Sequence, residues 1–263
     1  MTEMTTPTNI STWAPESRPD LRGRTVVVVG GSGGVGEGVV AAALAAGATV
    51  IATGRDQGRL DLLAKRGSEG DEAGRLETRV LDAMSADLEN DVTALAEEFG
   101  PFDGVVISVA SWGDQGRKGA LDLTDEEWQR LLDGNLTSVF RLFRAFLPRM
   151  SRSGALMQLN GLSADLPFPG SAGVALSAAA TKSLTVTLAA ELGGRGPRIH
   201  QLILGVVRTR ARQEAGIDDR RWIDATQIGD HVAQLVAGTS DLSDTALQYF
   251  VERGTGPVSG PSA

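Results

Sequence analysis

The chain has 263 residues, of which 41% are hydrophobic, so it can bury a large core. Its formal net charge of −8 gives no electrostatic reason to expect a nucleic acid or an anionic membrane surface as a partner. The absence of cysteine excludes disulfides and thiolate catalysis, and the two histidines, His200 and His231, are not at metal-ligand spacing, so we expect no metal site.

The two ends of the chain are predicted to be flexible tails. Residues 1–18 are rich in Thr, Ser and Pro and lack the apolar core of a signal peptide. The longest apolar stretches, such as Val39–Ala46, are far shorter than the roughly 20 residues needed to span a bilayer. We therefore expect a cytoplasmic protein with no membrane partner. We place a tail at 1–19, a single domain at 20–254 and a Gly/Pro/Ser-rich tail at 255–263.

Short apolar runs alternate with stretches of helical spacing between these tails. The runs have 4 to 6 residues, which is too short for helices, and predict strands at 25–29, 48–52, 76–81, 104–109, 155–159, 199–204 and 248–251. Helices are predicted at 34–46, 57–65, 87–99, 125–149, 171–192 and 228–237. Continuously apolar strands that alternate with helices indicate parallel pairing, so we predict a doubly wound α/β fold with about seven strands flanked by helices.

A glycine-rich turn joins the first predicted strand to the first predicted helix. Glycines permit a tight turn and a close backbone approach, and the helix N-terminus that follows offers unpaired N–H groups to an anion. The alternative is a flexible turn without a ligand. In this strand–turn–helix context we predict a pyrophosphate site made by Gly30, Ser32, Gly33, Gly34, Val35 and Gly36.

The spacing Gly30-x-x-x-Gly34-x-Gly36 resembles that of the short-chain dehydrogenase/reductase family. The segment that starts at Asp20 and precedes the first predicted strand resembles that family as well. The resemblance extends from about Asp20 to Gly254. It implies a Rossmann fold, a nicotinamide dinucleotide cofactor and oxidoreductase chemistry.

The end of the second predicted strand bears on the cofactor. NAD-binding proteins place a carboxylate there on the ribose, whereas an Arg accommodates a 2′-phosphate. Gly54 occupies the acidic position here and Arg55 follows it, which favours NADP(H) over NAD(H). The alternative is a solvated Arg55, with Asp56 reaching the ribose.

Further cofactor contacts are implied by the resemblance. The Asp82 position typically contacts the adenine, with Ala83 beside it, although Asp82 could instead cap a helix beginning near Ser85. Ser108 lies where the family usually has Asn-Asn-Ala-Gly, and Thr209 matches a Thr that contacts the nicotinamide amide.

The positions of the family's catalytic Ser, Tyr and Lys fall on Gly161, Val174 and Ala178. The spacings of 13 and 4 residues between them agree with the family pattern. Sliding the register to use Lys182 still supplies no Tyr, because the only one is Tyr249, in the last predicted strand. We interpret Lys182 as a snorkelling surface side chain. The resemblance thus implies a degenerate Ser-Tyr-Lys site.

Other polar side chains could take over part of the lost chemistry. Asn135 falls on the family's catalytic Asn, although a structural role in a kinked helix is the alternative that we favour. The replacement candidates are Ser108, Asn135, Asn160, Ser163, Asp165 and Ser177. Trp112 either lines the pocket or has a plain packing role. The charged segment 210–228 is a polar substrate clamp or, as we favour, a solvated helix.

Three functions remain open from the sequence. The first is an atypical NADP(H)-dependent oxidoreductase acting on an activated small molecule, such as a quinone or a conjugated enone, which needs less help from a general acid. The second is a non-redox enzyme, such as a cyclase, isomerase or dehydratase. The third is a catalytically silent nucleotide-binding or scaffold protein. The resemblance also implies a homodimer or homotetramer formed through the helices predicted at 125–149 and 171–192.

Overall fold

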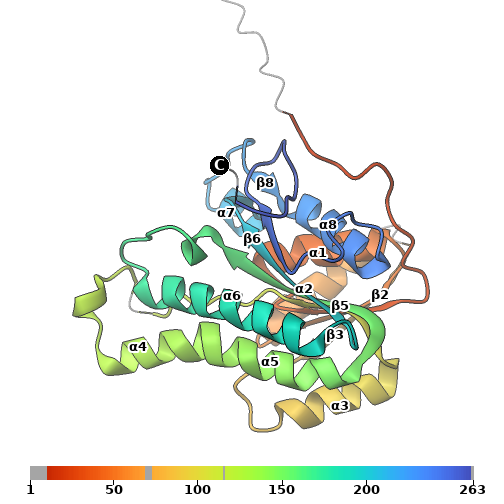
Figure 1. Ribbon diagram of the computed structural model, residues 1–263, viewed down its shortest axis with the longest axis horizontal. Helices are drawn as coiled ribbons and strands as arrows, with labels where there is room; N and C mark the ends of the chain where they lie inside the picture. Colours follow the sequence, from red (N-terminus) through yellow and green to blue (C-terminus); the bar gives the residue numbers. More distant parts are fainter. Residues whose placement is uncertain (1–10, 69–72, 115, 262–263) are drawn as a thin grey trace, which may run out of the picture.

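A computed structural model describes residues 11–68, 73–114 and 116–261. Its centre is a sheet of seven parallel strands in the order β3-β2-β1-β4-β5-β6-β9, which confirms the predicted doubly wound fold (Figure 1). These strands are β1 (Thr25–Val29), β2 (Thr49–Gly54), β3 (Arg75–Val80), β4 (Phe102–Ile107), β5 (Met150–Gly161), β6 (Arg198–Leu204) and β9 (Leu247–Phe250).

Helices cover both faces of the sheet. One face carries α1 (Gly34–Ala45), α2 (Gln57–Ser68) and α8 (Ala225–Ala237). The other carries α3 (Leu88–Phe99), α4 (Asp125–Leu132), α5 (Ser138–Phe146) and α6 (Ala172–Leu192). The central strands are therefore buried on both sides, which explains why residues 26–29 form an unbroken apolar run.

The long helix predicted at 125–149 is divided in the structure. A π-helical segment, η2 (Asp133–Thr137), separates α4 from α5, and a 3₁₀ turn, η3 (Leu147–Arg149), ends the run. At the wide turn, the Asn135 amide donates to the Leu131 carbonyl at 2.8 Å. Hydrophobic spacing survives such a local widening, so the sequence pattern did not reveal it.

The remaining short elements were not predicted because they contain too few residues to show a period. They are β7 (Val207–Arg208), β8 (Ile223–Asp224), α7 (Arg210–Glu214), η1 (Ala120–Asp122) and η4 (Leu162–Ala164). Strands β7 and β8 pair in parallel as a separate small sheet. Helix α8 also begins three residues earlier than the pattern predicted, because Asp224 and Gln227 form a capping box there.

Both end segments contact the body of the fold. The Trp13 ring packs edge-on against Phe250 with centroids 5.3 Å apart, and the Trp13 backbone N–H donates to the Arg253 carbonyl at 2.9 Å. Val258 forms an isolated antiparallel bridge with Tyr249 at the free edge of β9. The boundaries of the domain at 20 and 254 stay a prediction.

Helix α6 is long and apolar enough to cross a membrane by length and composition alone, with a mean hydropathy of 1.3. Core helices of water-soluble proteins pass the same test. Here α6 packs against β6, and its Ser177, Thr181 and Thr185 are buried.

Candidate functional site

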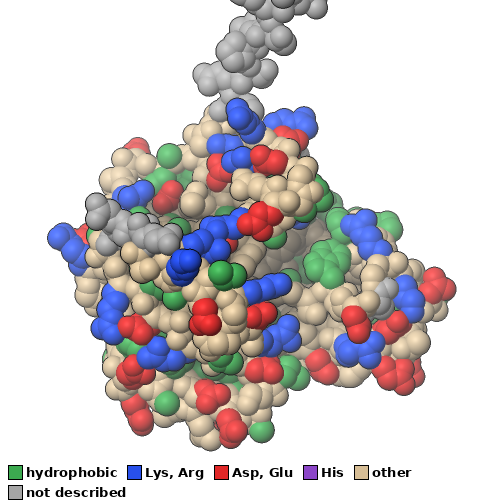
Figure 2. Space-filling model, turned by 180° about the vertical axis from the view of Figure 1, so that it is seen from behind, with side chains coloured by type: hydrophobic (Ala, Val, Ile, Leu, Met, Phe, Trp, Pro, Cys, Tyr) green, Lys and Arg blue, Asp and Glu red, His purple; other side chains and the backbone are tan. Residues whose placement is uncertain are grey.

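A cleft of about 1320 Å³ opens at the carboxyl ends of the central strands. Figure 2 shows the hollow on this face, with hydrophobic side chains on one rim and charged side chains around it. Loops after β1, β2, β4, β5 and β6 contribute to its walls. Ligands of open parallel sheets bind in this place, because neighbouring loops diverge there.

The glycine-rich turn after β1 forms one end of the cleft. Gly30 has a φ of +83°, and a Cβ there would lie 2.2 Å from the Ser108 carbonyl oxygen. A Cβ on Gly36 would lie 2.3 Å from the Gly30 oxygen. The N-cap of α1 is Gly33, which provides no side chain to cap the first turn. The turn therefore exposes backbone to the cleft as a pyrophosphate requires, and the residues present fit such a group.

The end of β2 lies beside this turn and is basic. A Cβ on Gly54 would lie 3.0 Å from the Ser32 hydroxyl, so the position is nearly filled. Arg55 and Arg59 both line the cleft. The Asp56 carboxylate accepts from the Arg59 backbone N–H at 3.0 Å, and thereby caps the first turn of α2. Sequence reasoning missed Arg59, although its position four residues after Arg55, at the start of the predicted helix, was a usable signal.

Asp82 and Ala83 line the cleft after β3. The alternative prediction, that Asp82 caps the following helix, is wrong. Its carboxylate accepts from the Met84 N–H at 2.9 Å and closes a local turn. Helix α3 begins at Leu88 with Asp87 at its N-cap, so Asp82 does not cap it.

Asn135 is buried in the cleft wall and all its amide atoms are engaged. Its oxygen accepts from the Ser111 N–H at 2.9 Å, while its nitrogen donates to the Ser111 carbonyl at 2.7 Å and to that of Leu131. These bonds tie the π-helical turn to the loop that carries Ser108. They favour the structural role for Asn135.

Gly161, Val174 and Ala178 all line the cleft. Gly161 ends β5, whereas Val174 and Ala178 lie one turn apart on α6. The Asn160 amide donates to the Ala178 carbonyl at 3.0 Å and holds the two elements together. Among the described residues that line the cleft there is neither a Tyr nor a Lys.

The interpretation of Lys182 as a snorkelling surface side chain is wrong. Its ammonium forms an ion pair with Asp165 and donates to the Tyr249 hydroxyl at 2.8 Å, while that hydroxyl donates to Asp165 at 2.9 Å. Burial lowers the pKa of Lys182, but the hydrogen bonds to Asp165 and Tyr249 outweigh it and leave the pKa raised. These three residues are not among those that line the cleft.

The other replacement candidates divide into two groups. Ser108, Asn160 and Ser163 line the cleft. Ser177 is fully buried on α6 and does not line it, so its hydroxyl is not available to a ligand.

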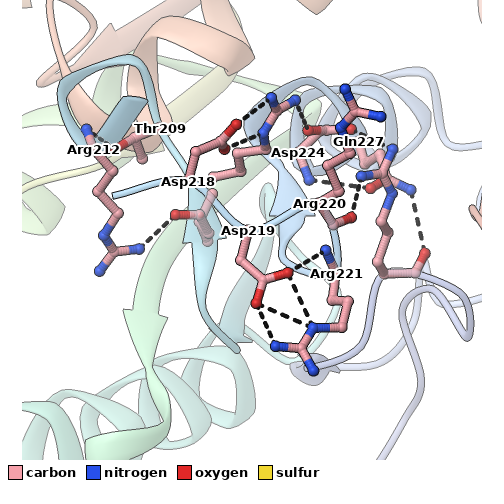
Figure 3. A network of polar contacts seen from close by, with 11 residues as sticks. Thr209, Arg212, Asp218, Asp219, Arg220, Arg221, Asp224 and Gln227 are labelled. Carbon is pink, nitrogen blue, oxygen red and sulfur yellow. Dashed lines mark hydrogen bonds and ion pairs between the residues drawn. The ribbon is translucent and has the colours of Figure 1, made fainter. Parts of the chain in front are cut away.

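The charged segment after β6 forms a network of polar contacts (Figure 3). Thr209 caps α7 by accepting from the Arg212 N–H at 3.4 Å, and both residues line the cleft. Arg208 pairs with Asp218 at 2.5 Å and with Asp224 at 3.4 Å, which ties the segment together. The favoured prediction of a solvated helix over this segment is wrong, because only Arg210–Glu214 and the start of α8 are helical. The segment is partly an internal ion-pair network and partly a source of cleft residues.

Two arginines, Arg130 and Arg212, and a tryptophan also line the cleft. Sequence reasoning did not single out Arg130, whereas Arg212 belongs to the charged segment 210–228, for which a clamp was one of the two interpretations. Trp112 lines it too, as one of its two interpretations required. Within the described parts of the chain, no group of three or more His, Asp or Glu residues is placed to hold a metal ion.

Comparison with known proteins places this geometry in context. The family model for enoyl-(acyl carrier protein) reductase matches residues 30–252. The 3β-hydroxysteroid dehydrogenase 1 of Eggerthella lenta is 31% identical over 205 residues, covering 76% of this chain and 76% of that protein. A 3-oxoacyl-[acyl-carrier-protein] reductase of Vibrio cholerae is 27% identical over 230 residues, covering 83% of this chain and 90% of that protein.

Solved structures show the same fold. A short-chain dehydrogenase/reductase of Brucella melitensis superposes with a TM-score of 0.77 at 26% identity, covering 91% of this chain and 98% of that one. An NADPH-bound short-chain oxidoreductase of Pseudomonas aeruginosa, described as containing an atypical catalytic center, gives a TM-score of 0.74 at 26% identity. It covers 90% of this chain and 98% of that one.

Proposed function

Because this chain belongs to the short-chain dehydrogenase/reductase family, we propose that it binds NADP(H) in the cleft and transfers hydride to an activated small molecule. It would do so without the family's usual Ser, Tyr and Lys. The observation that carries the proposal is the cleft itself, which joins an open glycine turn at one end to the aliphatic pair Val174 and Ala178 at the other.

The cofactor would lie along the carboxyl ends of the strands. The N–H groups at the start of α1 would bind the pyrophosphate, and Asp82 and Ala83 would line the adenine side. Thr209 and Ser108 would flank the nicotinamide end. When bound, the dihydronicotinamide supplies the hydride.

NADP(H) is favoured over NAD(H) by the charges at the end of β2. Arg55 and Arg59 line the cleft there, and Gly54 leaves no carboxylate at the ribose position. Asp56 is engaged by the first turn of α2 and by the Arg59 guanidinium at 3.8 Å. A 2′-phosphate would meet two guanidinium groups, whereas the ribose hydroxyls of NAD(H) would gain little.

The side chains around the nicotinamide end restrict the reaction. Val174 and Ala178 can neither donate a proton nor stabilise an alkoxide. A side-chain general acid contributes about 10²- to 10⁴-fold in rate, so simple ketones would react very slowly. A conjugated acceptor delocalises the charge that hydride brings, and water can protonate the product afterwards. The Ser163 hydroxyl, which lines the cleft, is available to hold the acceptor oxygen.

The proposal is tested by following NADPH consumption with acceptors of two kinds. We expect NADPH to be oxidised in the presence of 1,4-benzoquinone, after correction for the uncatalysed reaction, and not in the presence of cyclohexanone. Saturable NADPH binding by fluorescence titration is the first requirement. Protein that binds no NADPH, or that reduces cyclohexanone as well as the quinone, would overturn the proposal.

A gain-of-function variant examines the missing acid directly. In Val174→Tyr/Ala178→Lys, a phenol and an ammonium would enter the cleft wall one helical turn apart. We expect this double variant to acquire measurable ketone reduction, with Val174→Phe/Ala178→Met as a control of similar bulk.

We also propose that the chain associates with itself through α5 and α6. Leu176 and Val186 on α6 are 46% and 43% exposed, and Phe140 on α5 is 46% exposed. Exposed apolar side chains on neighbouring helices are typical of an interface. Light scattering should give a dimer or tetramer, and Val186→Glu should shift it toward the monomer. A wild-type monomer at micromolar concentration would refute the association. The cytoplasmic location stays a prediction.

A further inference from the structure

We infer that the acceptor carries a carboxylate group and that the Arg212 guanidinium binds this group in the wall of the cleft. The inference rests on the proposed function and adds the chemical class of the substrate, a conjugated carbonyl compound with one anionic end. It comes from the fixed position of Arg212, from its lack of a carboxylate partner and from the balance of the other charges in the cleft.

Three contacts hold Arg212 in place. One nitrogen of its guanidinium donates to the Val207 carbonyl, and the guanidinium carbon lies 5.5 Å from the centre of the Trp222 ring. Its backbone N–H donates to the Thr209 hydroxyl at 3.4 Å. Arg212, Val207 and Thr209 all line the cleft. The protein therefore orients this guanidinium, and Thr209, which the proposed function puts at the nicotinamide end, lies beside it.

The aspartates of the charged segment are engaged by other arginines. Asp218, Asp219 and Asp224 each form an ion pair, and none of these pairs includes Arg212. Figure 3 shows Arg212 to one side of these pairs. Within the described ranges of the chain, no carboxylate lies within ion-pair distance of the Arg212 guanidinium. The segment thus neutralises its other cations and leaves one positive charge at the cleft.

The other three arginines of the described cleft lining are accounted for. Arg55 and Arg59 lie at the end of β2, where the 2′-phosphate is proposed to bind. Arg130 lies 3.6 Å from Asp114, and Asp133, three residues after Arg130, also lines the cleft. The remaining guanidinium is therefore the cation that is left for the acceptor.

A fixed guanidinium with free N–H groups suits an oxyanion at one end of the ligand. Its forked donors match the two oxygens of a carboxylate, and such charge-assisted bonds are roughly twice as strong as neutral ones. Val174 and Ala178 give the body of the acceptor an aliphatic wall, while Arg212 gives its end a charge. A small ligand with a carboxylate at one end and a conjugated ketone at the other meets both requirements.

Pairing of the carboxylate also assists the proposed hydride transfer. In trans-4-oxo-2-pentenoate, the ionised carboxylate is joined to the alkene and makes it a poorer acceptor, an effect that a guanidinium on the carboxylate offsets. The carbon next to the carboxylate accepts the hydride from NADPH, the alkene electron pair moves toward the ketone oxygen, and water protonates the carbon next to the ketone. The products are NADP⁺, 4-oxopentanoate and hydroxide, so atoms and electrons balance.

The binding test uses 4-oxopentanoate and its methyl ester, which differ in charge but share the ketone. Both are titrated by calorimetry into the full chain saturated with NADP⁺, so that no turnover occurs. The variants are Arg212→Gln, which removes the charge, and Arg212→Lys, which keeps it without the fork. The matched control is Arg221→Gln, because Arg221 lies in the same segment, pairs with Asp219 and is not among the residues that line the cleft.

We expect the wild type to bind 4-oxopentanoate at least tenfold more tightly than the ester. Arg212→Gln should abolish this preference, Arg212→Lys should keep part of it, and Arg221→Gln should keep it within twofold. NADPH affinity should stay within twofold in all three variants, which shows that each is folded. If Arg212→Gln fails to fold, Arg212→Met takes its place, since it keeps an apolar stem beside Trp222.

Two binding results would overturn the inference. A wild type that binds the acid and the ester equally has no carboxylate site, and an equal loss of preference in Arg221→Gln would mean that only the overall charge matters. Arg212→Gln that binds NADPH, NADH and ADP-ribose equally weakly would assign Arg212 to the cofactor pyrophosphate instead of the acceptor.

Kinetics separate this inference from the proposed function. With NADPH, Arg212→Gln should lower kcat/KM for trans-4-oxo-2-pentenoate at least tenfold and change that for its methyl ester less than twofold. Equal losses for both compounds would overturn the carboxylate site even if NADPH is oxidised. Binding of 4-oxopentanoate that depends on Arg212, without NADPH oxidation by the acid, the ester or benzoquinone, would overturn the proposed reaction while the carboxylate site stands.

Discussion

Removal of Arg55 should convert a preference for NADPH into near-equal binding of NADPH and NADH. Arg55 lies at the end of β2, in the wall of the cleft, and follows a glycine where a carboxylate would select NAD(H). Its only proposed partner is the 2′-phosphate, which NADH lacks. Arg55→Ala therefore removes an interaction with one cofactor and leaves the other almost unchanged.

The expected size follows from the exposure of the site. A hydrogen bond to a charged group contributes about 1.5–3 kcal/mol, and solvent screening at this exposed position favours the lower figure. A loss of about 1.4 kcal/mol is tenfold in the dissociation constant. The Arg59 side chain is 70% exposed and is already paired with Asp56. Arg59→Ala should therefore raise the dissociation constant of NADPH only about three- to fivefold.

Calorimetric titration of NADPH and NADH into the wild type, Arg55→Ala and Arg59→Ala measures these ratios. Repeating the titrations at higher salt should narrow the difference between the two cofactors in the wild type, because the phosphate contact is electrostatic. Equal weakening of NADPH and NADH in Arg55→Ala would refute the assignment, as would a wild type that prefers NADH.

Three further changes examine other parts of the structure. Gly36→Ala brings a Cβ within 2.3 Å of the Gly30 oxygen and should weaken NADPH binding at least tenfold, whereas Gly196→Ala, whose Cβ meets nothing closer than 3.5 Å, should leave titrations unchanged. Burial lowers the pKa of His200 to about 4, so the unfolded chain binds more protons between pH 6.5 and 4. The free energy of unfolding from urea titrations should therefore fall by up to about 3 kcal/mol as the pH is lowered from 6.5 to 4. His200→Gln should remove this contribution to the pH dependence of stability; an unchanged pH dependence in the variant would contradict the assignment to His200. Lys182→Met removes the ion pair to Asp165 and the hydrogen bond to Tyr249, which then keep only their bond to each other, and should reduce the free energy of unfolding by about 1–3 kcal/mol without changing NADPH affinity; unchanged stability would contradict the role of this cluster.

The sequence predicted those features that depend on neighbouring residues. The strand at Thr25–Val29 and the glycine turn after it were recognised because burial on both faces and close backbone approach each leave a continuous local pattern. The seven strands and their parallel pairing followed from the alternation of strands and helices.

Features that depend on distant residues were not predictable in this way. Lys182 meets Tyr249, which is 67 residues further along the chain, and nothing near either residue announces the contact. The π-helical turn at Asn135 leaves the hydrophobic pattern intact. Hydrogen bonds of the Asn135 side-chain amide join the turn to a loop 24 residues away. The cleft position of Arg212 depends on how the segment after β6 folds back, which is set by ion pairs between its own residues.

The pH dependence of quinone reduction tests the central claim, that hydride transfer here uses no side-chain acid of the usual kind. Among the described residues that line the cleft there is no His, Cys, Tyr or Lys, so no group there has an ordinary pKa between 6 and 9. We therefore predict that kcat/KM for 1,4-benzoquinone with NADPH is constant across that range. A profile governed by a single ionisation between pH 6 and 9 would reveal an acid or base in the protein and contradict the account.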